Sequence, residues 1–176
     1  MDYFFSVRGR AGDLYSDKLG KAKYLAIPGS VKQATRAHEI DKRKWFKAVQ
    51  SKAGAKPLIK GHIVIFVHGF NTEQYDMLER HRKIRKGLEA HGFKGTLISF
   101  DWPSNGSALG YSSDRRDARL SADRLFRDGL TELSALQQED CDFNTMSWRI
   151  PWAASCFVRH LTTPMMITRQ PRKAGP

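Results

Sequence analysis

The sequence predicts an α/β protein in which a mainly parallel sheet carries helices on both faces, and three observations indicate this class. Strand-like apolar runs alternate along the chain with amphipathic helical stretches, as in parallel sheets with crossover helices. The run Ile63–Val67 is continuously apolar, which is typical of a strand covered on both faces. The 176 residues, 40% of them hydrophobic and 27% charged, suit one domain with a core.

Two strands and a helix are expected in the first part of the chain. Asp2–Val7 is aromatic and β-rich and precedes the turn-prone segment 8–12, and Lys23–Ile27 is stopped by a Pro-Gly pair. Between residues 37 and 52, apolar residues recur at helical spacing. They are Ile40, Trp45, Phe46 and Val49. Segment 53–60, with its glycine and proline, is expected to be a loop.

A helix is expected directly after the strand Ile63–Val67. Asn71 suits the N-cap, with Gln74 three residues later as its capping-box partner. His91 and Gly92 end the helix. Its apolar face is expected to consist of Tyr75, Leu78, Ile84 and Leu88.

The alternation continues in the last part of the body. Thr96–Phe100 is the next expected strand, and residues 113–137 form a long helical stretch. The core-facing residues of that stretch are expected to be Ala118, Ala122, Leu125, Phe126, Leu133 and Leu136. A further strand is expected near Phe143.

Three segments resemble the esterase-like branch of the α/β-hydrolase superfamily. They are Val64-Ile65-Phe66-Val67-His68-Gly69-Phe70-Asn71, Ser99-Phe100-Asp101-Trp102-Pro103-Ser104 and Asp114-Arg115-Arg116-Asp117-Ala118. The His-Gly dipeptide is common by itself, but here it ends a strand of the buried type and precedes a helix. The resemblance covers residues 1–144 and implies a partial α/β-hydrolase sheet, mainly parallel, whose C-terminal half is missing.

This resemblance implies acyl transfer from a Ser nucleophile, with a His base and an acid that orients it. Phe70 would supply one backbone N–H of the oxyanion hole, and Gly69 would let the backbone approach the substrate. His68, Asn71 and Asp101 would shape the site. The implied substrate is a small-molecule ester, and no cofactor is required. Two alternatives stay open: His68-Gly69 as a tight turn only, and Asp101 as a cap of the turn that follows it.

The nucleophile itself has no candidate in the chain. The superfamily presents it on a Gly-x-Ser-x-Gly-like elbow after the next strand, and no such pattern occurs. Segment 144–155, where the elbow is expected, contains Pro151, which disfavours a central strand. Ser147, Ser155 and His160 are not substitutes, because no strand–turn–helix pattern presents them. No catalytic residue is therefore assigned.

A shifted reading frame explains the tail. All 18 acidic residues lie at or before Asp142, so residues 1–144 carry +7 and residues 145–176 carry +5. If one C is restored between the codons of Thr145 and Met146, permissible codons read Thr-His-Val-Val-Ala-His-Ser-Met-Gly-Gly, a strand with a serine elbow. We interpret residues 1–144 as the N-terminal part of an α/β-hydrolase domain, residues 145–176 as an out-of-frame, irregular basic tail, and the chain as an inactive truncated fragment. The alternative is a native proline-rich basic tail.

A basic nucleic-acid-binding or interaction module is the alternative function. The net charge is +12 and the pI is near 10.0, and two runs concentrate bases, Lys42–Lys47 and Arg80–Lys86. The second run lies on a helix whose other face is needed for the core, so a solvated helix face explains it better. We expect no specific nucleic-acid partner.

The remaining composition favours a cytoplasmic protein. Two cysteines, Cys141 and Cys156, do not make a disulfide framework. No apolar run approaches the ~18 residues of a membrane span, and the N-terminus lacks a signal-peptide pattern, so no membrane partner is expected. The six histidines do not form metal-ligand spacing, and phosphate-loop and dinucleotide fingerprints are absent. The residues carry no prediction of oligomeric state.

Overall fold

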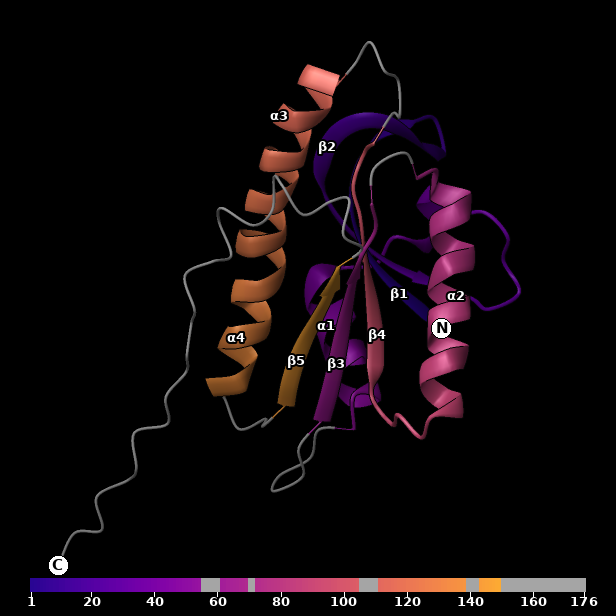
Figure 1. Ribbon diagram of the computed structural model, residues 1–176, viewed down its shortest axis with the longest axis vertical. Coiled ribbons are helices and arrows are strands. Elements are labelled where there is room, and N and C mark those ends of the chain that lie inside the picture. The colour runs from indigo at the N-terminus through magenta and orange to yellow at the C-terminus, as the bar shows by residue number, and fades with distance from the viewer. Residues whose placement is uncertain (55–60, 70–71, 105–110, 139–142, 150–176) are drawn as a thin grey trace, which may run out of the picture.

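The computed structural model describes residues 1–54, 61–69, 72–104, 111–138 and 143–149, and its strands form one five-stranded sheet (Figure 1). The strands are β1 (Asp2–Ala11), β2 (Leu14–Ile27), β3 (Gly61–Val67), β4 (Thr96–Asp101) and β5 (Phe143–Arg149). The sheet order is β2-β1-β4-β3-β5. Strand β2 is antiparallel to β1, whereas β1, β4, β3 and β5 run parallel. The predicted class, a mainly parallel sheet with helices, is confirmed.

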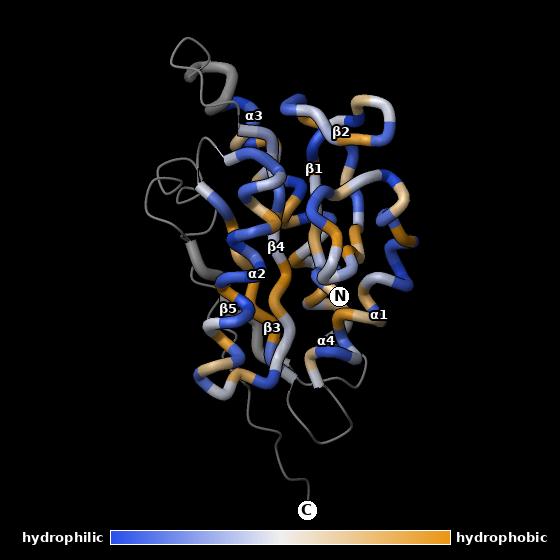
Figure 2. The backbone as a smooth tube through the Cα atoms, turned by 90° about the vertical axis from the view of Figure 1, so that its right-hand side faces the viewer, coloured by the Kyte–Doolittle hydropathy of each residue, from blue (hydrophilic) through white to orange (hydrophobic). Residues whose placement is uncertain are grey.

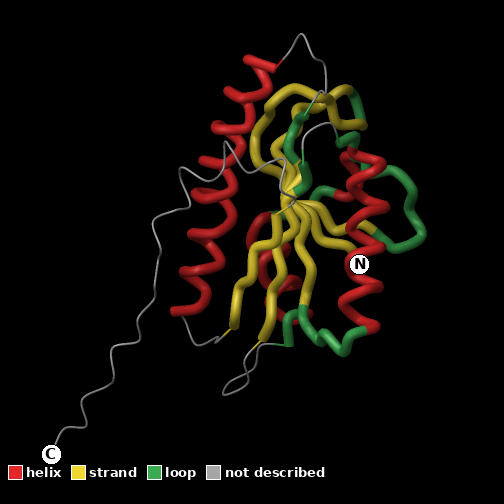
Figure 3. Tube along the Cα trace, viewed as in Figure 1, coloured by secondary structure: helices red, strands yellow, loops and turns green. Residues whose placement is uncertain are grey.

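Helices cover both faces of this sheet (Figure 3). They are α1 (Lys42–Lys52), α2 (Gln74–Ala90), α3 (Tyr111–Arg124) and α4 (Thr131–Gln138), with a 3₁₀ turn at Arg36–His38 and a π-helical turn at Leu125–Leu130 between α3 and α4. Helix α1 begins where the Asp41 carboxylate accepts the backbone N–H groups of Arg43 and Lys44, a side-chain N-cap.

The order of the strands reverses direction within the sheet. The chain passes from β3 through α2 to its neighbour β4, and then back past β3 to β5. Helix α2 therefore lies on one face of the sheet, and α3 and α4 lie on the other (Figure 1). Open α/β sheets bind ligands outside the carboxyl ends of strands where the strand order reverses in this way.

Each face of the sheet has its own apolar cluster, because neighbouring residues of a strand point to opposite faces. In β3, Ile63, Ile65 and Val67 join one cluster with α1, α3 and α4, while Val64 and Phe66 join a second cluster with α2. This explains why β3 is continuously apolar. Figure 2 shows β3 and β4 as hydrophobic strands in the middle of the molecule.

The central elements lie where the sequence predicted them. The expected strands Ile63–Val67 and Thr96–Phe100 fall within β3 and β4, and the strand expected near Phe143 is β5. Strand β5 pairs with β3 over seven residues and crosses the composition boundary after Asn144. It ends before Pro151, and in the described residues it lies at the edge of the sheet, where a nearby proline is tolerated.

The first hairpin differs from its prediction. Strand β1 continues through Arg8 and Gly9, which were expected in a turn, and the chain reverses instead at Gly12, whose φ is 63°. Strand β2 begins at Leu14 rather than Lys23. The prediction was wrong because segment 8–12 was taken as turn-prone from its local sequence, whereas β1 pairs with β2 as far as Ala11 and acids from other elements compensate the charge of Arg8.

The predicted start of α2 is also wrong. Asn71 lies outside the described residues, and the helix begins at Gln74 with Glu73 in the N-cap position. The physical reason lies in Thr72, because its backbone N–H and carbonyl both bind side chains from other elements. Because these tertiary contacts engage the backbone of Thr72, the helix begins only at Gln74.

Two aromatic residues predicted to face the core are exposed instead. Tyr75 is 49% exposed in the first turn of α2, and Phe126 is 51% exposed. Phe126 belongs to the π-helical turn, whose extra residue per turn shifts the helical register. Ala118, Leu125 and Leu133 are buried as predicted, and Ala122 is partly buried. The side chain of Leu136 lies outside those described.

Candidate active site

Polar side chains from three parallel strands and their following loops are buried together at the carboxyl edge of the sheet. Each is at most 4% exposed, a burial that polar groups tolerate only when paired. They are Ser6, Arg8, His68, Thr72, Asp101 and Ser104.

Arg8 is the centre of this cluster. Its Nε–H donates to Asp101 Oδ1 at 2.7 Å, one terminal nitrogen donates to Asp17 Oδ1, and the other donates to the carbonyl of Thr72 at 2.7 Å. Ser6 Oγ donates to the second oxygen of Asp101 at 3.0 Å. One guanidinium thus contacts the end of β4, the hairpin strand β2 and the loop after β3.

Electrostatics keep this ion pair charged. Burial would raise the pKa of Asp101, but the charge of Arg8 and its hydrogen bond outweigh burial and hold that pKa at about 2. For Arg8, burial would lower the pKa, and the charges of Asp101 and Asp17 raise it instead. The carboxylate is therefore an anion whose charge is neutralised internally, and it is not placed to act as a general base.

His68 is fixed by hydrogen bonds at both ring nitrogens. Its Nε2 accepts the backbone N–H of Trp102 at 3.1 Å, so the proton belongs on Nδ1, which donates to the Gly69 carbonyl at 2.7 Å. This neutral tautomer makes the 3.6 Å approach of Nε2 to Asp101 a close contact rather than a charged pair. Trp102 stacks on the imidazole at 5.3 Å, and its Nε1–H donates to the His68 carbonyl.

The loop after β3 is anchored on both sides of residues 70–71. On one side, the Gly69 carbonyl accepts bonds from His68 and from Thr72 Oγ1, the latter at 3.2 Å. On the other side, the Thr72 N–H donates to Ser104 Oγ at 3.1 Å, and Arg80 donates to Thr72 Oγ1 at 3.3 Å. These bonds fix the backbone at Gly69 and at Thr72.

Gly69 is buried, yet a Cβ built at this position would meet no described atom within 4 Å beyond its chain neighbours. Its φ is not in the left-handed region, so neither the described packing nor the backbone conformation requires glycine there.

The structure brings three of the five sequence-predicted site residues together. His68 and Gly69 follow β3, and Asp101 ends the adjacent β4. Phe70 and Asn71 lie outside the described residues. Among the described residues, Asp101 contacts Arg8, Ser6 and His68.

Sequence reasoning missed the other members of the cluster. Arg8 and Ser6 come from β1, and Thr72 and Ser104 come from loops. The available signal was that Arg8 and Asp101 each follow an apolar run of a strand, because parallel strands end at the same edge. The pairing itself depends on the β1–β4 register, which joins Ser6 to Asp101.

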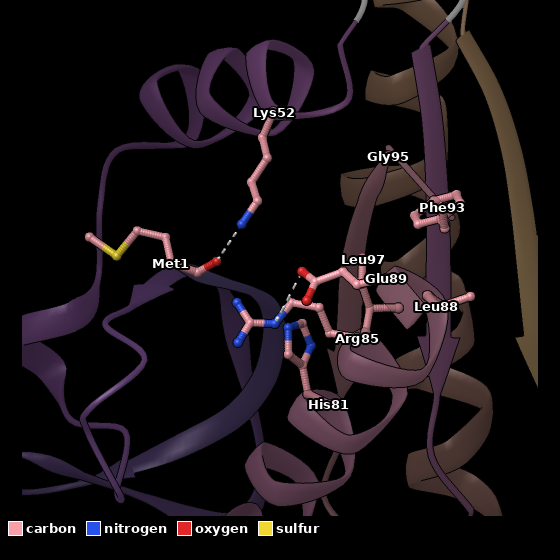
Figure 4. Close-up of a pocket in the computed structure, with 9 residues that line it drawn as sticks. All are labelled: Met1, Lys52, His81, Arg85, Leu88, Glu89, Phe93, Gly95 and Leu97. Carbon is pink, nitrogen blue, oxygen red and sulfur yellow. Dashed lines mark hydrogen bonds and ion pairs between the residues drawn. The ribbon is translucent and has the colours of Figure 1, made fainter. Parts of the chain in front are cut away.

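The cavity drawn in Figure 4 lies at the opposite, amino edge of the sheet, between Met1, the end of α1 and the end of α2. It encloses about 10 Å³, room for about one water molecule, so it cannot hold an organic substrate. Two side chains that line it, His81 and Arg85, belong to a second buried cluster around Asp2. This cavity therefore offers no alternative substrate site.

The strand topology and the anchored His-Gly loop define an α/β-hydrolase-type domain. The family model described as "Alpha/beta hydrolase of unknown function (DUF900)" matches residues 41–141, more than half of the chain. The chain belongs to this family. No curated protein and no solved structure gave a significant match.

The family match covers His68, Thr72, Asp101 and Ser104 but not Arg8. Among the described side chains, no group of histidine, cysteine and acidic residues could hold a metal ion. No helix in the described part of the chain is long and apolar enough to cross a membrane.

Proposed function

We propose that this protein derives from a serine hydrolase that cleaves small carboxylic esters. The observation that supports this most is the anchored loop after β3 in a member of an α/β-hydrolase family. In this superfamily one oxyanion donor lies in a loop after a central strand, and the nucleophile follows a neighbouring strand. Strand β5 begins at Phe143, before the proposed shift of frame, and runs parallel to β3 and directly beside it. A strand that continued from Phe143 in the restored frame at this place would bring its elbow close to the loop.

In this proposal the Phe70 N–H is an oxyanion donor, the Gly69 backbone borders the substrate, and His68, Asn71 and Asp101 maintain the loop. Donors of this kind act because negative charge develops on the carbonyl oxygen in the transition state, and loss of one costs ~2.7–4 kcal/mol. The carbonyl oxygen of the ester would lie beside the Gly69 backbone. No cofactor takes part.

We further propose that translation is out of frame from about Met146, so that the chain as printed is inactive. Residues 145–176 contain no acid and no serine elbow, and one restored base yields Ala-His-Ser-Met-Gly directly after a β-branched run. Loss of the nucleophile alone leaves only residual catalysis in a serine hydrolase.

The test compares three proteins: the chain as printed, a one-base-restored version translated to its next stop codon, and the restored version with its elbow serine changed to alanine. Hydrolysis of p-nitrophenyl acetate is expected only in the restored protein with the serine. Activity in the printed chain, or equal activity with and without the elbow serine, would contradict the proposal. Genomic sequence without an overlapping strand-and-elbow frame would contradict the shifted frame.

The contacts of α2 count against specific nucleic-acid binding. Arg82 and Arg85 bind the buried carboxylate of Asp2, at 2.9 and 3.0 Å, and Arg80 binds Thr72. Three of the five bases in the run are thus engaged within the protein. We propose a small-molecule substrate and a cytoplasmic location, and no nucleic-acid partner.

A further inference from the structure

We propose that Arg8 is a positioning residue: its guanidinium holds Asp101 and Thr72, which lies two residues after the proposed oxyanion donor, in fixed positions. This inference rests on the proposed hydrolase function and names the residue outside the family-matched segment that completes the site. It is distinct from a role in overall folding alone, because one of the three guanidinium contacts is made to the loop after β3 itself, at the Thr72 carbonyl.

The geometry links Arg8 to the loop directly and indirectly. Directly, one terminal nitrogen donates to the Thr72 carbonyl at 2.7 Å. Indirectly, Nε–H holds Asp101 at 2.7 Å, and the residue after Asp101 donates its backbone N–H to His68. Arg8 therefore contacts Thr72 directly and is linked to His68 through Asp101 and Trp102.

Among the described side chains, no charged group other than Arg8 binds the Thr72 carbonyl. Ser104 Oγ also reaches that carbonyl, but at 3.5 Å, a length at which a hydrogen bond is weak. The Thr72 N–H is already bound to Ser104, so Thr72 is not a free oxyanion donor. The hydrogen bonds of Thr72 therefore fix the position of the first described residue after residues 70–71.

Arginine has a shape that this position requires. All three guanidinium nitrogens are used, by Asp101, Asp17 and Thr72, and they form a rigid planar fork. A lysine has one nitrogen on a flexible stem, so it can pair with Asp101 but cannot hold all three partners in fixed directions. Since apolar replacements of buried ion pairs are often as stable as the pair, stability by itself does not account for this arrangement.

Amide hydrogen exchange of the full printed chain tests the proposal without any need for activity. The variants are Arg8→Met and Arg8→Lys, and the matched control is Arg10→Met, because Arg10 lies on the same strand in an exposed pair with Glu39. Both Arg8 variants are expected to raise exchange of the Thr72 amide at least tenfold relative to amides of β3. Arg10→Met should leave this ratio unchanged.

Equal acceleration at Thr72 and in β3 would mean that Arg8 acts only on global stability, and an unchanged ratio would mean that it does not hold the loop; either result overturns the proposal. Arg8→Lys keeps the charge, so it serves as the decisive variant if Arg8→Met does not fold.

A second measurement uses the frame-restored protein with p-nitrophenyl acetate. Arg8→Lys is expected to lower kcat at least tenfold with KM within threefold of the parent, whereas Arg10→Lys leaves both unchanged. An unchanged kcat in Arg8→Lys would overturn the positioning role. If the restored protein shows no hydrolysis at all, the proposed function fails, while the exchange ratio still decides whether Arg8 holds the loop.

Discussion

Strand β1 carries a buried charge cluster at each end of the sheet, and the two clusters are built differently. At the carboxyl edge, Arg8 and Asp101 are each 1% exposed, and every guanidinium nitrogen has a partner. At the amino edge, the buried Asp2 is held by Arg82 and Arg85, which are 24% and 28% exposed. One cluster encloses its cation, and the other leaves its cations in contact with solvent.

The amino-edge cluster is also less completely bonded. Within the described residues, Asp2 Oδ1, His81 Nε2 and Arg85 Nε have no hydrogen-bond partner that meets normal geometry, although Asp2 Oδ1 forms an ion pair with Arg85. The small cavity beside His81 and Arg85 gives room for one water molecule (Figure 4). The difference indicates that the amino-edge contacts hold the start of the chain in place, whereas the carboxyl-edge contacts fix the relative positions of the side chains that they join.

Removal of a carboxylate charge should produce the largest difference in stability between the two clusters. Asp101→Asn leaves Arg8 buried with only the half-exposed Asp17 as an anionic partner, so we expect the free energy of unfolding to fall by about 3–5 kcal/mol. Asp2→Asn should cost only about 1–2 kcal/mol, because Arg82 and Arg85 can turn toward water. Urea titration of both variants measures the difference. Equal losses would show that the enclosure of Arg8 has no energetic consequence.

Acid should disturb the amino edge before the carboxyl edge. Burial is the main cause that lowers the pKa of His81 to about 3, from 6.5 in the unfolded chain, and Arg85 and Arg82 add to it against the opposing effect of Asp2. The unfolded state then binds the extra proton, so this contribution is complete above pH 6.5 and is lost as pH falls toward 3. We expect a loss of about 3 kcal/mol between pH 7 and pH 4.

The control for this pH dependence is His81→Gln, which keeps a polar side chain beside Ser99 but does not titrate. Its unfolding free energy should depend less on pH between 6.5 and 4, whereas His91→Gln, at an exposed position, should behave like the parent. Asp101 has its pKa at about 2, below its usual 3.8, so its contribution is kept above about pH 4 and lost between 4 and 2. A parent whose stability is flat from pH 7 to 4 would contradict the assignment of a neutral His81.

The contrast between the clusters also shows which features the sequence can predict. The strand β3 is predictable because burial on two faces makes it continuously apolar, as Val64 and Ile65 on opposite faces illustrate. The pairing of Arg8 with Asp101 is not, since it joins residues 93 positions apart through the parallel register of β1 and β4. The late start of α2 follows from the same tertiary contacts at Thr72, which local capping rules cannot include.

The smallest expected difference concerns one serine in each cluster. Ser6 Oγ donates to the charged Asp101 at 3.0 Å, and Ser99 Oγ lies 2.7 Å from Nδ1 of the neutral His81; both serines are fully buried. Because a hydrogen bond to a charged group contributes more than one between neutral groups, Ser6→Ala should cost about 2 kcal/mol and Ser99→Ala about 1 kcal/mol. Urea titrations at pH 7 measure both losses in otherwise identical chains. A larger loss in Ser99→Ala would contradict the view that the hydrogen bond to the charged Asp101 contributes more stability than the hydrogen bond to the neutral His81.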